Sequence, residues 1–289
     1  MRMKYECLPC LVNQTIRVAE LTNAGHREEL FRKIFEYLSH IGFDETNPEI
    51  TGATFKLLKA HIGNNDPYRE TRAYYNKLFL DMLDTFAQRI DGAENPFALA
   101  LKYAIIGNII DFNPIHNTTM QDIMRWFEDA DRLSLTIDQT GKLEDRLQSA
   151  KSLLYIGDNC GEICLDMLLI QRIKRLNPDM EIFFGVRGEP VVNDSIEADA
   201  YFVGMDRYAT IISNGDSSMG TVLSRCSDAF RRVYSSADVI IAKGQANYES
   251  LSEEREKNLF FLLVTKCEVI AKAVGVPVQS LVCVNGYGA

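Results

Sequence analysis

Three side chains suited to metal binding or acid–base chemistry, Asp158, Asn159 and Glu162, stand close together in the stretch YIGDNCGE. They follow the apolar run 152–156 and precede the amphipathic segment ICLDMLLIQRIKRL. The run is typical of a buried strand and the segment of a helix, so we expect the three side chains at the carboxyl end of a strand. Taken alone, the stretch is explained as well by a purely structural role, an Asp helix cap followed by a turn, as by a functional site.

Polar residues follow three further predicted strands, which are contained in EIFFGVRG, TIISNG and DVIIAKG. Ligands of open α/β sheets bind outside the carboxyl ends of the strands, so these clusters are expected to meet at one rim. Each cluster alone is compatible with turns and caps, and their shared location favours a site. The residues of the three clusters are Arg187, Asn193 and Asp194, then Asn214, Gly220 and Thr221, then Lys243, Asn247 and Glu249.

The oxygen-rich side chains of the rim favour a hard divalent cation. Asp158, Asn159 and Asp194 would offer two carboxylates and one amide oxygen, ligands that suit Mg²⁺ or Mn²⁺ better than a thiolate-preferring ion. A cation in this place would contact a phosphate oxygen and a water molecule and lower the pKa of that water. Asp158 or Glu162 would orient the water as a general base.

Positive groups for a phosphate are expected at the same rim. Lys243 carries a mobile charge suited to a phosphate oxygen. Gly161 and Gly220 stand where helices are predicted to begin, so backbone N–H groups there would bind an anion. The further candidates for substrate contact are Arg187, Asn193, Thr221, Asn247 and Glu249.

A fifth polar cluster lies in the helical half of the chain. Asn108 and Asp111, in AIIGNIIDF, are three residues apart and would share one helix face. A buried Asn and Asp need partners, which a network between helices would supply as well as a substrate would. In the functional interpretation, this face lies across a cleft from the strand ends and contacts the organic part of the substrate. His116 is a further candidate ligand or base, although a single loop histidine is more often neither.

The two halves of the chain have different hydrophobic patterns. Apolar residues spaced at three and four predict helices in the first half, including one over DPYRETRAYYNKLFLDMLDTFAQRI. From Ser152 onward, β-rich runs alternate with amphipathic segments such as GTVLSRCSDAFRRVYSSA, which indicates a mainly parallel sheet covered on both faces. The other expected strands are AYFVG, LFFLLV and SLVCVN. We therefore predict an α/β fold, with an all-helical domain over residues 1–145 and a Rossmann-like domain over residues 146–289 that carries the site.

The bulk composition argues against nucleic acid as a partner and against a membrane or secreted location. The net charge of −9, from 31 basic and 40 acidic residues, argues against nucleic acid. No run approaches the length of a membrane span, and the N-terminus lacks the continuous apolar region of a signal peptide. Seven scattered cysteines argue against a disulfide framework and favour a cytoplasmic location. The oligomeric state is not indicated.

Two of the cysteines, Cys7 and Cys10, form a lone CxxC motif. One such pair cannot complete a four-ligand zinc site, so the pair is redox-active, half of a metal site completed elsewhere, or two packed thiols. Packing is the default, because free cysteines are so often buried. Cys160 lies within the proposed metal turn, but no histidine is close in sequence to activate it.

Read in order, GDNCGE, RGEPVVND, SNGDSSMGT and KGQANYE resemble the damage-control phosphatase family, and GNIIDF and CLPC are similar to its prokaryotic and archaeal branch. The resemblance covers essentially the whole chain. It implies a helical domain on a Rossmann-like domain, with Asp158, Asn159 and Asp194 as metal ligands and Lys243 as the phosphate-binding lysine. Family members favour Mn²⁺, Co²⁺ or Ni²⁺ and act on damaged or surplus phosphorylated metabolites. Matched motif positions with less defined roles are Glu162, Asn193, Asn247 and Glu249.

The sequence thus predicts metal-dependent hydrolysis of small phosphomonoesters, such as sugar, nucleotide or cofactor phosphates. One alternative is a carboxyl methyltransferase that uses S-adenosylmethionine, an activity proposed for a eukaryotic relative. GDNCGE lacks the closely spaced glycines expected for that cofactor, and Lys243 would have no evident task there. The second alternative is a non-catalytic metal-binding protein.

Overall fold

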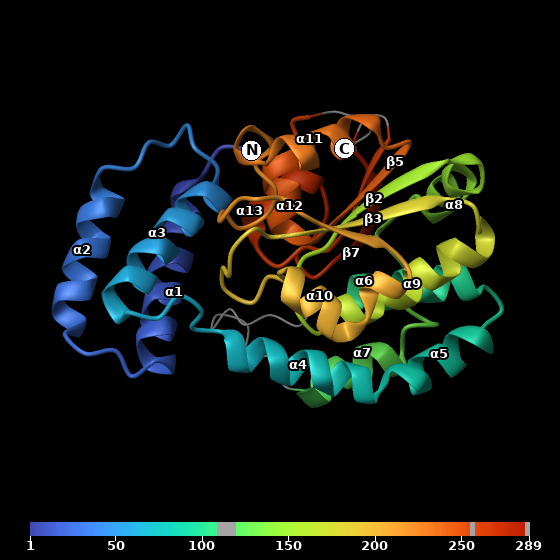
Figure 1. The fold of residues 1–289 in the computed structure, drawn as a ribbon, viewed down its shortest axis with the longest axis horizontal. Helices are drawn as coiled ribbons and strands as arrows, with labels where there is room; N and C mark the ends of the chain where they lie inside the picture. Colours follow the sequence, from blue (N-terminus) through green and yellow to red (C-terminus); the bar gives the residue numbers. More distant parts are fainter. Residues whose placement is uncertain (109–119, 255–257, 287–289) are drawn as a thin grey trace.

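A seven-stranded sheet in the order β1-β7-β6-β5-β2-β3-β4 forms the centre of the molecule (Figure 1). The structure, a computed structural model, describes residues 1–108, 120–254 and 258–286. Paired strands are parallel except for β6 and β7, which confirms the predicted α/β fold with a mainly parallel sheet. The strands are β1 (Ile137–Asp138), β2 (Ser152–Ile156), β3 (Glu181–Val186), β4 (Thr210–Ser213), β5 (Val239–Lys243), β6 (Leu259–Val264) and β7 (Leu281–Asn285).

Helices fill most of the first half of the chain and cover the sheet in the second half. The first set is α1 (Leu8–Leu21), α2 (Arg27–Ser39), α3 (Asn47–Ile62), α4 (Arg69–Asp81), α5 (Leu83–Asp91), α6 (Pro96–Gly107) and α7 (Met120–Glu128). The second set is α8 (Thr140–Ser149), α9 (Glu162–Leu176), α10 (Glu197–Val203), α11 (Asp228–Ser236), α12 (Gly244–Leu251) and α13 (Glu268–Val274). No helix in the described ranges is long and apolar enough to cross a membrane.

Strand residues alternate between two cores, one on each face of the sheet. On β2, Leu153 and Tyr155 join a core that also contains residues of α6 and α9. Leu154 and Ile156 join the other core, with residues of α11, α12 and α13. The strands therefore read as unbroken apolar runs, because both of their faces are buried.

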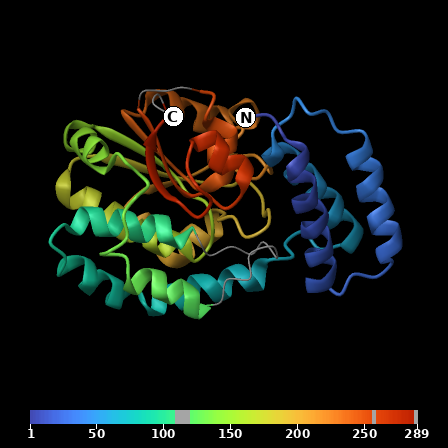
Figure 2. The ribbon, with the colours of Figure 1, turned by 180° about the vertical axis from the view of Figure 1, so that it is seen from behind.

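The first-half helices are arranged in two groups (Figures 1 and 2). One group, α4 to α7, lies below the sheet in Figure 1: α6 shares a layer with α9 and α10, and α4, α5 and α7 lie further from the sheet. The other group, α1 to α3, lies at one end of the molecule. Because α6 packs directly on α9, helices from before residue 145 share a core with the sheet. The division into domains at residues 145 and 146 stays a prediction.

Three sequence-based element predictions are wrong. AYFVG, expected as a strand, lies largely in α10, where Ala200 and Val203 are buried while Tyr201 and Phe202 are more than half exposed. That spacing is helical, but a segment this short does not distinguish a helix from a strand by its pattern. The single helix expected through DPYRETRAYYNKLFLDMLDTFAQRI is divided at Met82 into α4 and α5, although no proline or glycine marks the break.

The third error concerns the start of α11. No α-helix begins at Gly220; a short 3₁₀ turn occupies Leu223–Arg225, and α11 begins only at Asp228. The Ser227 hydroxyl caps α11 by accepting a hydrogen bond from the backbone N–H of Phe230 at 3.2 Å. The sequence also gave no sign of β1, because two residues are too few to show a period.

The strand order reverses beside β2. From β2 the chain proceeds through β3 and β4 on one side, and β5 and β6 lie on the other side. Sheets of this kind bind ligands at the carboxyl ends of the strands where the order reverses. The edge at β2 and β5 is therefore the place to look for a site.

Candidate active site

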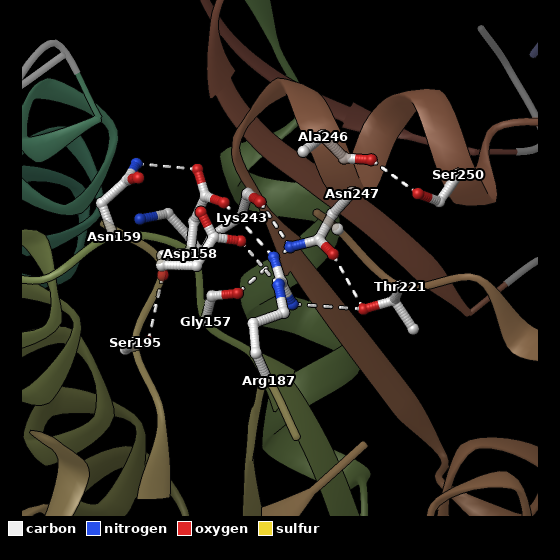
Figure 3. A network of polar contacts seen from close by, with 12 residues as sticks. Gly157, Asp158, Asn159, Arg187, Ser195, Thr221, Lys243, Ala246, Asn247 and Ser250 are labelled. Carbon is white, nitrogen blue, oxygen red and sulfur yellow. Dashed lines mark hydrogen bonds and ion pairs between the residues drawn. The ribbon is translucent and has the colours of Figure 1, made fainter. Parts of the chain in front are cut away.

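The four polar clusters predicted from the sequence follow four adjacent parallel strands, β5, β2, β3 and β4. Most of their members belong to one buried network of hydrogen bonds and ion pairs, part of which is drawn in Figure 3. The predicted site residues in this network are Asn108, Asp158, Asn159, Glu162, Arg187, Asn193, Asp194, Thr221, Lys243 and Asn247. Asp111 and His116 lie outside the described residues.

The loops after β2 and β3 are joined along their backbones. The carbonyl oxygen of Asp158 accepts hydrogen bonds from the backbone N–H of Ser195 at 2.8 Å and from its hydroxyl at 3.0 Å. Asn159 pairs with Asp194 as an isolated antiparallel bridge. These contacts bring Asp158, Asn159 and Asp194 together although they come from different strands.

Arg187 forms ion pairs with both carboxylates of this group, and Figure 3 shows it between Asp158 and Thr221. Its Nε donates to Asp194 Oδ2 at 2.6 Å, and its Nη2 is 3.4 Å from Asp158 Oδ1. On the other side, its Nη1 is 3.4 Å from the Thr221 hydroxyl. The guanidinium is 1% exposed, so it meets both aspartates away from solvent.

Asn108, the C-terminal cap of α6, brings the helical half into contact with the same carboxylates. Its Nδ2 donates to Asp158 Oδ2 at 2.9 Å and to Glu162 Oε2 at 3.0 Å. The Asn159 amide makes the same two contacts, at 2.9 Å and 3.0 Å. As predicted, the helix that carries Asn108 lies against the strand ends, and Asn108 contacts the carboxylates there.

Lys243 lies beneath the Glu162 carboxylate and is fully buried. Its ammonium forms ion pairs with Glu162 Oε1 and, at 2.6 Å, with Asp166 Oδ1. Its third hydrogen bond goes to the carbonyl oxygen of Ala104 at 2.8 Å. Tyr155 donates to Asp166 Oδ1 at 2.6 Å. Since all three N–H donors of Lys243 have protein acceptors, contact with a phosphate would require one to be redirected, and that assignment stays a prediction.

The buried network carries an excess of negative charge. Four carboxylates, from Asp158, Glu162, Asp166 and Asp194, face two cations, Arg187 and Lys243, which leaves a net charge of −2 when all are ionised. Burial raises the pKa of Asp158 well above its usual value, and Asp194 and Glu162 add to the rise. Burial likewise raises the pKa of Asp194, against the opposing effect of Arg187. A divalent cation beside these carboxylates would cancel the excess.

The available donor atoms fit a hard cation. Asp158, Asn159 and Asp194 supply oxygens only, and the Asn159 Oδ1 is oriented by a 2.8 Å hydrogen bond from Asn193 Nδ2. Asn108 Oδ1 is a further buried oxygen, without a hydrogen-bond partner in the described part of the chain. Within the described residues no three His, Cys, Asp or Glu side chains form a ready metal centre, so a cation here would depend on the Asn159 amide as well as two carboxylates.

Thr221 and Asn247 tie the strand-end loops together. The Asn247 Oδ1 accepts from the Thr221 hydroxyl at 2.8 Å. Its Nδ2 donates to the carbonyl oxygens of Gly157 at 3.1 Å and Lys243 at 2.7 Å. These contacts hold the loops after β4, β5 and β2 in register, whatever further contact the two residues make with a substrate.

The two glycines proposed for anion binding direct their N–H groups to protein acceptors. Gly161, at φ +81°, donates to Asn76 Oδ1 at 2.7 Å. The backbone N–H of Gly220 is near Asp194 and opposes the rise in the pKa of that carboxyl, which burial causes. Both groups therefore support the ligand-bearing loops in this structure.

Glu249, Cys7 and Cys10 lie apart from the network. The Glu249 carboxylate meets Asn47 Nδ2 at 3.4 and 3.5 Å, on α3. Cys7 precedes α1, and burial raises the pKa of its thiol to about 11, with a smaller contribution from the charge of Glu249. The redox or metal-binding role of Cys7 and Cys10 stays a prediction.

Glu249 makes the stability of the fold depend on pH. Burial raises the pKa of Glu249 from 4.5 to about 7. The free energy of unfolding is therefore unaffected by this group below about pH 4.5, and it falls as the pH rises from there through about 7, because the carboxyl must then ionise while buried. At about 1.4 kcal/mol per unit, the loss is roughly 3 kcal/mol. Glu249→Gln should therefore gain free energy of unfolding relative to the unmodified protein between about pH 5 and about pH 8. Chemical denaturation measures the gain, and Glu253→Gln, at an exposed position, should show none.

Lys266 was missed by the sequence reasoning. It follows β6, the parallel neighbour of β5, and is only half-buried. Its positive charge is near enough to oppose the rise in the pKa of Asp158, which burial dominates. LLVTKC contains the signal that could have indicated it, an apolar run followed closely by a lysine.

The whole chain matches known proteins in sequence and in fold. Residues 3–282 match the family described as Damage-control phosphatase ARMT1-like domain. The chain belongs to this family. The family predicted from the four strand-end motifs is thereby confirmed.

Two archaeal relatives carry the family's name. The chain is 32% identical to the Damage-control phosphatase PH1575 of Pyrococcus horikoshii, over 99% of this chain and 98% of that protein. It is 33% identical to the Damage-control phosphatase of Archaeoglobus fulgidus, over 76% of each. A crystal structure of a DUF89 family protein from P. horikoshii superposes with a TM-score of 0.91 at 31% identity, covering 99% of each chain. These names favour neither a methyltransferase nor a non-catalytic protein.

Proposed function

We propose that this chain is a divalent-metal-dependent phosphatase that hydrolyses phosphomonoesters of small metabolites, in metabolite damage control. The observation that carries the proposal is the buried pair Asp158 and Asp194, which share Arg187 at the strand-order reversal in a network whose net charge is −2 when all its groups are ionised. Family membership supports the phosphatase class. The substrate class is sugar, nucleotide or cofactor phosphates, and the scattered cysteines support a cytoplasmic enzyme.

Asp158, Asn159 and Asp194 would hold the cation, which is Mn²⁺, Co²⁺, Ni²⁺ or Mg²⁺. When bound, it would supply the positive charge and Lewis acidity that phosphoryl transfer requires. The protein prepares this place by holding each oxygen in position: Asn108 and Asn159 amides fix the Asp158 carboxylate, and Asn193 fixes the Asn159 oxygen.

Two side chains of the rim would neutralise a phosphate. The Arg187 fork makes a short bond only to Asp194, while its contacts with Asp158 and Thr221 are long, at 3.4 Å each. Its remaining N–H groups suit two phosphate oxygens. Lys266 would add a second positive charge from the end of β6.

Glu162 or Asp158 would orient the attacking water and accept its proton. The Glu162 carboxylate is anchored on one oxygen by Lys243 and on the other by the amides of Asn108 and Asn159. Such anchoring fixes its direction relative to Asp158. The same two amides hold both carboxylates, so either one could serve as the base.

The test of the proposal is Asp194→Asn, which keeps the shape of the side chain and removes its charge. Metal-stimulated phosphate release should fall roughly 100-fold or more, since charge stabilisation of this kind is worth that much. The assay is a phosphate-release screen over sugar, nucleotide and cofactor phosphates with several divalent ions and with a chelator. Asp179→Asn, at an exposed position, is the matched control.

The outcomes separate the proposal from its rivals. Full metal-stimulated activity in folded Asp194→Asn protein would contradict the proposed site. Metal binding without turnover of any phosphoester in the screen would instead indicate a non-catalytic metal-binding protein. Circular dichroism of each variant shows whether the fold is retained, since Arg187 loses its short ion pair in Asp194→Asn.

A further inference from the structure

Asn76, on α4, is fully buried against the turn that carries two of the proposed metal ligands. Its Oδ1 accepts the 2.7 Å hydrogen bond from the backbone N–H of Gly161, two residues after Asn159. The amide cannot flip freely, because its Nδ2 donates to Asp199 Oδ1 at 3.3 Å. Asn76 therefore holds the first ligand-bearing turn from outside the sheet.

Asp199, on α10, holds the second ligand-bearing loop in the same way. Its Oδ2 accepts a hydrogen bond from the backbone N–H of Ile196 at 3.1 Å. Ile196 is two residues after Asp194, just as Gly161 is two residues after Asn159. The hydrogen bond between Asn76 and Asp199 thus adds a side-chain link between two loops that are also joined along their backbones.

Arg72 fixes the orientation of the linking pair. Its Nε donates to Asp199 Oδ2 at 3.0 Å, and its Nη1 and Nη2 donate to Asp66 at 2.6 and 2.7 Å. The guanidinium is 2% exposed, and a bidentate ion pair of this kind is rigid as well as strong. The pair is consequently anchored to α4.

We propose that the hydrogen-bonded pair Asn76–Asp199 is a positioning device that, together with the backbone contacts between the two loops, sets the separation of the Asp158–Asn159 turn from the Asp194 loop, and thereby the affinity of the site for a divalent cation. The inference rests on the proposed function, which names the ligands. Both residues act through the loops they hold. Hydrogen bonds that orient metal ligands are worth roughly 10- to 100-fold in metal affinity.

The test is Mn²⁺ binding, measured by isothermal titration calorimetry on the full-length protein. Asn76→Ala removes the acceptor for Gly161 and the link to Asp199. Asn76→Asp keeps the acceptor but places two carboxylates in contact in a buried place, which is unfavourable. Adding Asp199→Asn exchanges the two groups: a carboxylate at 76 accepts from Gly161, and an amide at 199 donates to it while its oxygen still faces Arg72 and Ile196.

Asn76→Ala and Asn76→Asp should each bind Mn²⁺ roughly 10- to 100-fold more weakly than the unmodified protein. The exchanged variant N76D/D199N should recover most of that loss. Lys77→Ala, next along α4 at an exposed ion pair with Asp81, should bind normally. A merely structural role would lower the melting temperature of the variants without this pattern of loss and recovery.

Two results would overturn the inference. One is unchanged Mn²⁺ affinity in folded Asn76→Ala protein. The other is an exchanged variant that binds as weakly as Asn76→Asp, a comparison that stands even if Asn76→Ala fails to fold. Absence of Mn²⁺ binding in the unmodified protein is a different result, which contradicts the proposed metal site itself.

Discussion

Replacing Gly244 by alanine should abolish divalent-metal binding and phosphatase activity. Gly244 begins α12 at φ +76°, directly after Lys243. A Cβ at this position would lie 1.9 Å from Asp158 Oδ2 and 2.8 Å from Asn108 Nδ2. The Asp158 carboxylate would have to leave its place, and the hydrogen bond that Asn108 donates to it would be lost. We expect a loss of roughly 100-fold or more in phosphate release, as for removal of a charge-stabilising group.

Gly275 provides the matched control, because it has the same kind of backbone without the collision. It caps α13 at φ +82°, and a Cβ there meets nothing within 4 Å. Alanine at either glycine incurs the strain of a positive φ, on the order of 1 kcal/mol in the free energy of unfolding. Only Gly244→Ala should lose Mn²⁺ binding by calorimetry. Normal Mn²⁺ affinity in both variants would show that the site tolerates a Cβ atom at position 244.

The main features of the site followed from the sequence because parallel strands end at one edge. Asp158, Asn159 and Asp194 could be placed together without knowing the strand order, since each follows a recognisable apolar run. Arg187 was recognised as a member in the same way. Prediction succeeded where the position of a residue depends on its own strand alone.

Prediction failed where a role depends on partners from several elements. The three acceptors around Lys243 come from α6 and α9, and nothing in KGQANYE indicates that the lysine points at them. Asn76 belongs to no motif, and its importance comes from a turn 85 residues further along the chain. Glu249 is the opposite case to Asn76, because it belongs to a sequence motif but its carboxylate lies away from the network, on α12. Contacts of this kind are tertiary and have no local pattern in the sequence.

Replacing Lys243 by methionine should destabilise the fold severely, by about 3–5 kcal/mol, the usual cost of removing one partner of a buried ion pair. Glu162 and Asp166 would both remain buried without their shared cation. Burial raises the pKa of Asp166 to about 7 even beside Lys243. Without Lys243 the pKa of Asp166 should rise above this value, so the stability deficit of Lys243→Met relative to the unmodified protein should grow as the pH rises above about 7.

Chemical denaturation of Lys243→Met and of D166N/K243M measures this effect. Removing the Asp166 charge should restore part of the lost stability, with a coupling energy of about 1 kcal/mol or more for residues in direct contact. Lys272→Met, at an exposed position on α13, controls for the change of side chain. If Lys243 serves mainly to bind phosphate, Lys243→Met will instead keep nearly full stability and show a raised KM. The free energy of unfolding of Lys243→Met therefore distinguishes a lysine that mainly binds the substrate phosphate from one that mainly holds Glu162 in place for the reaction.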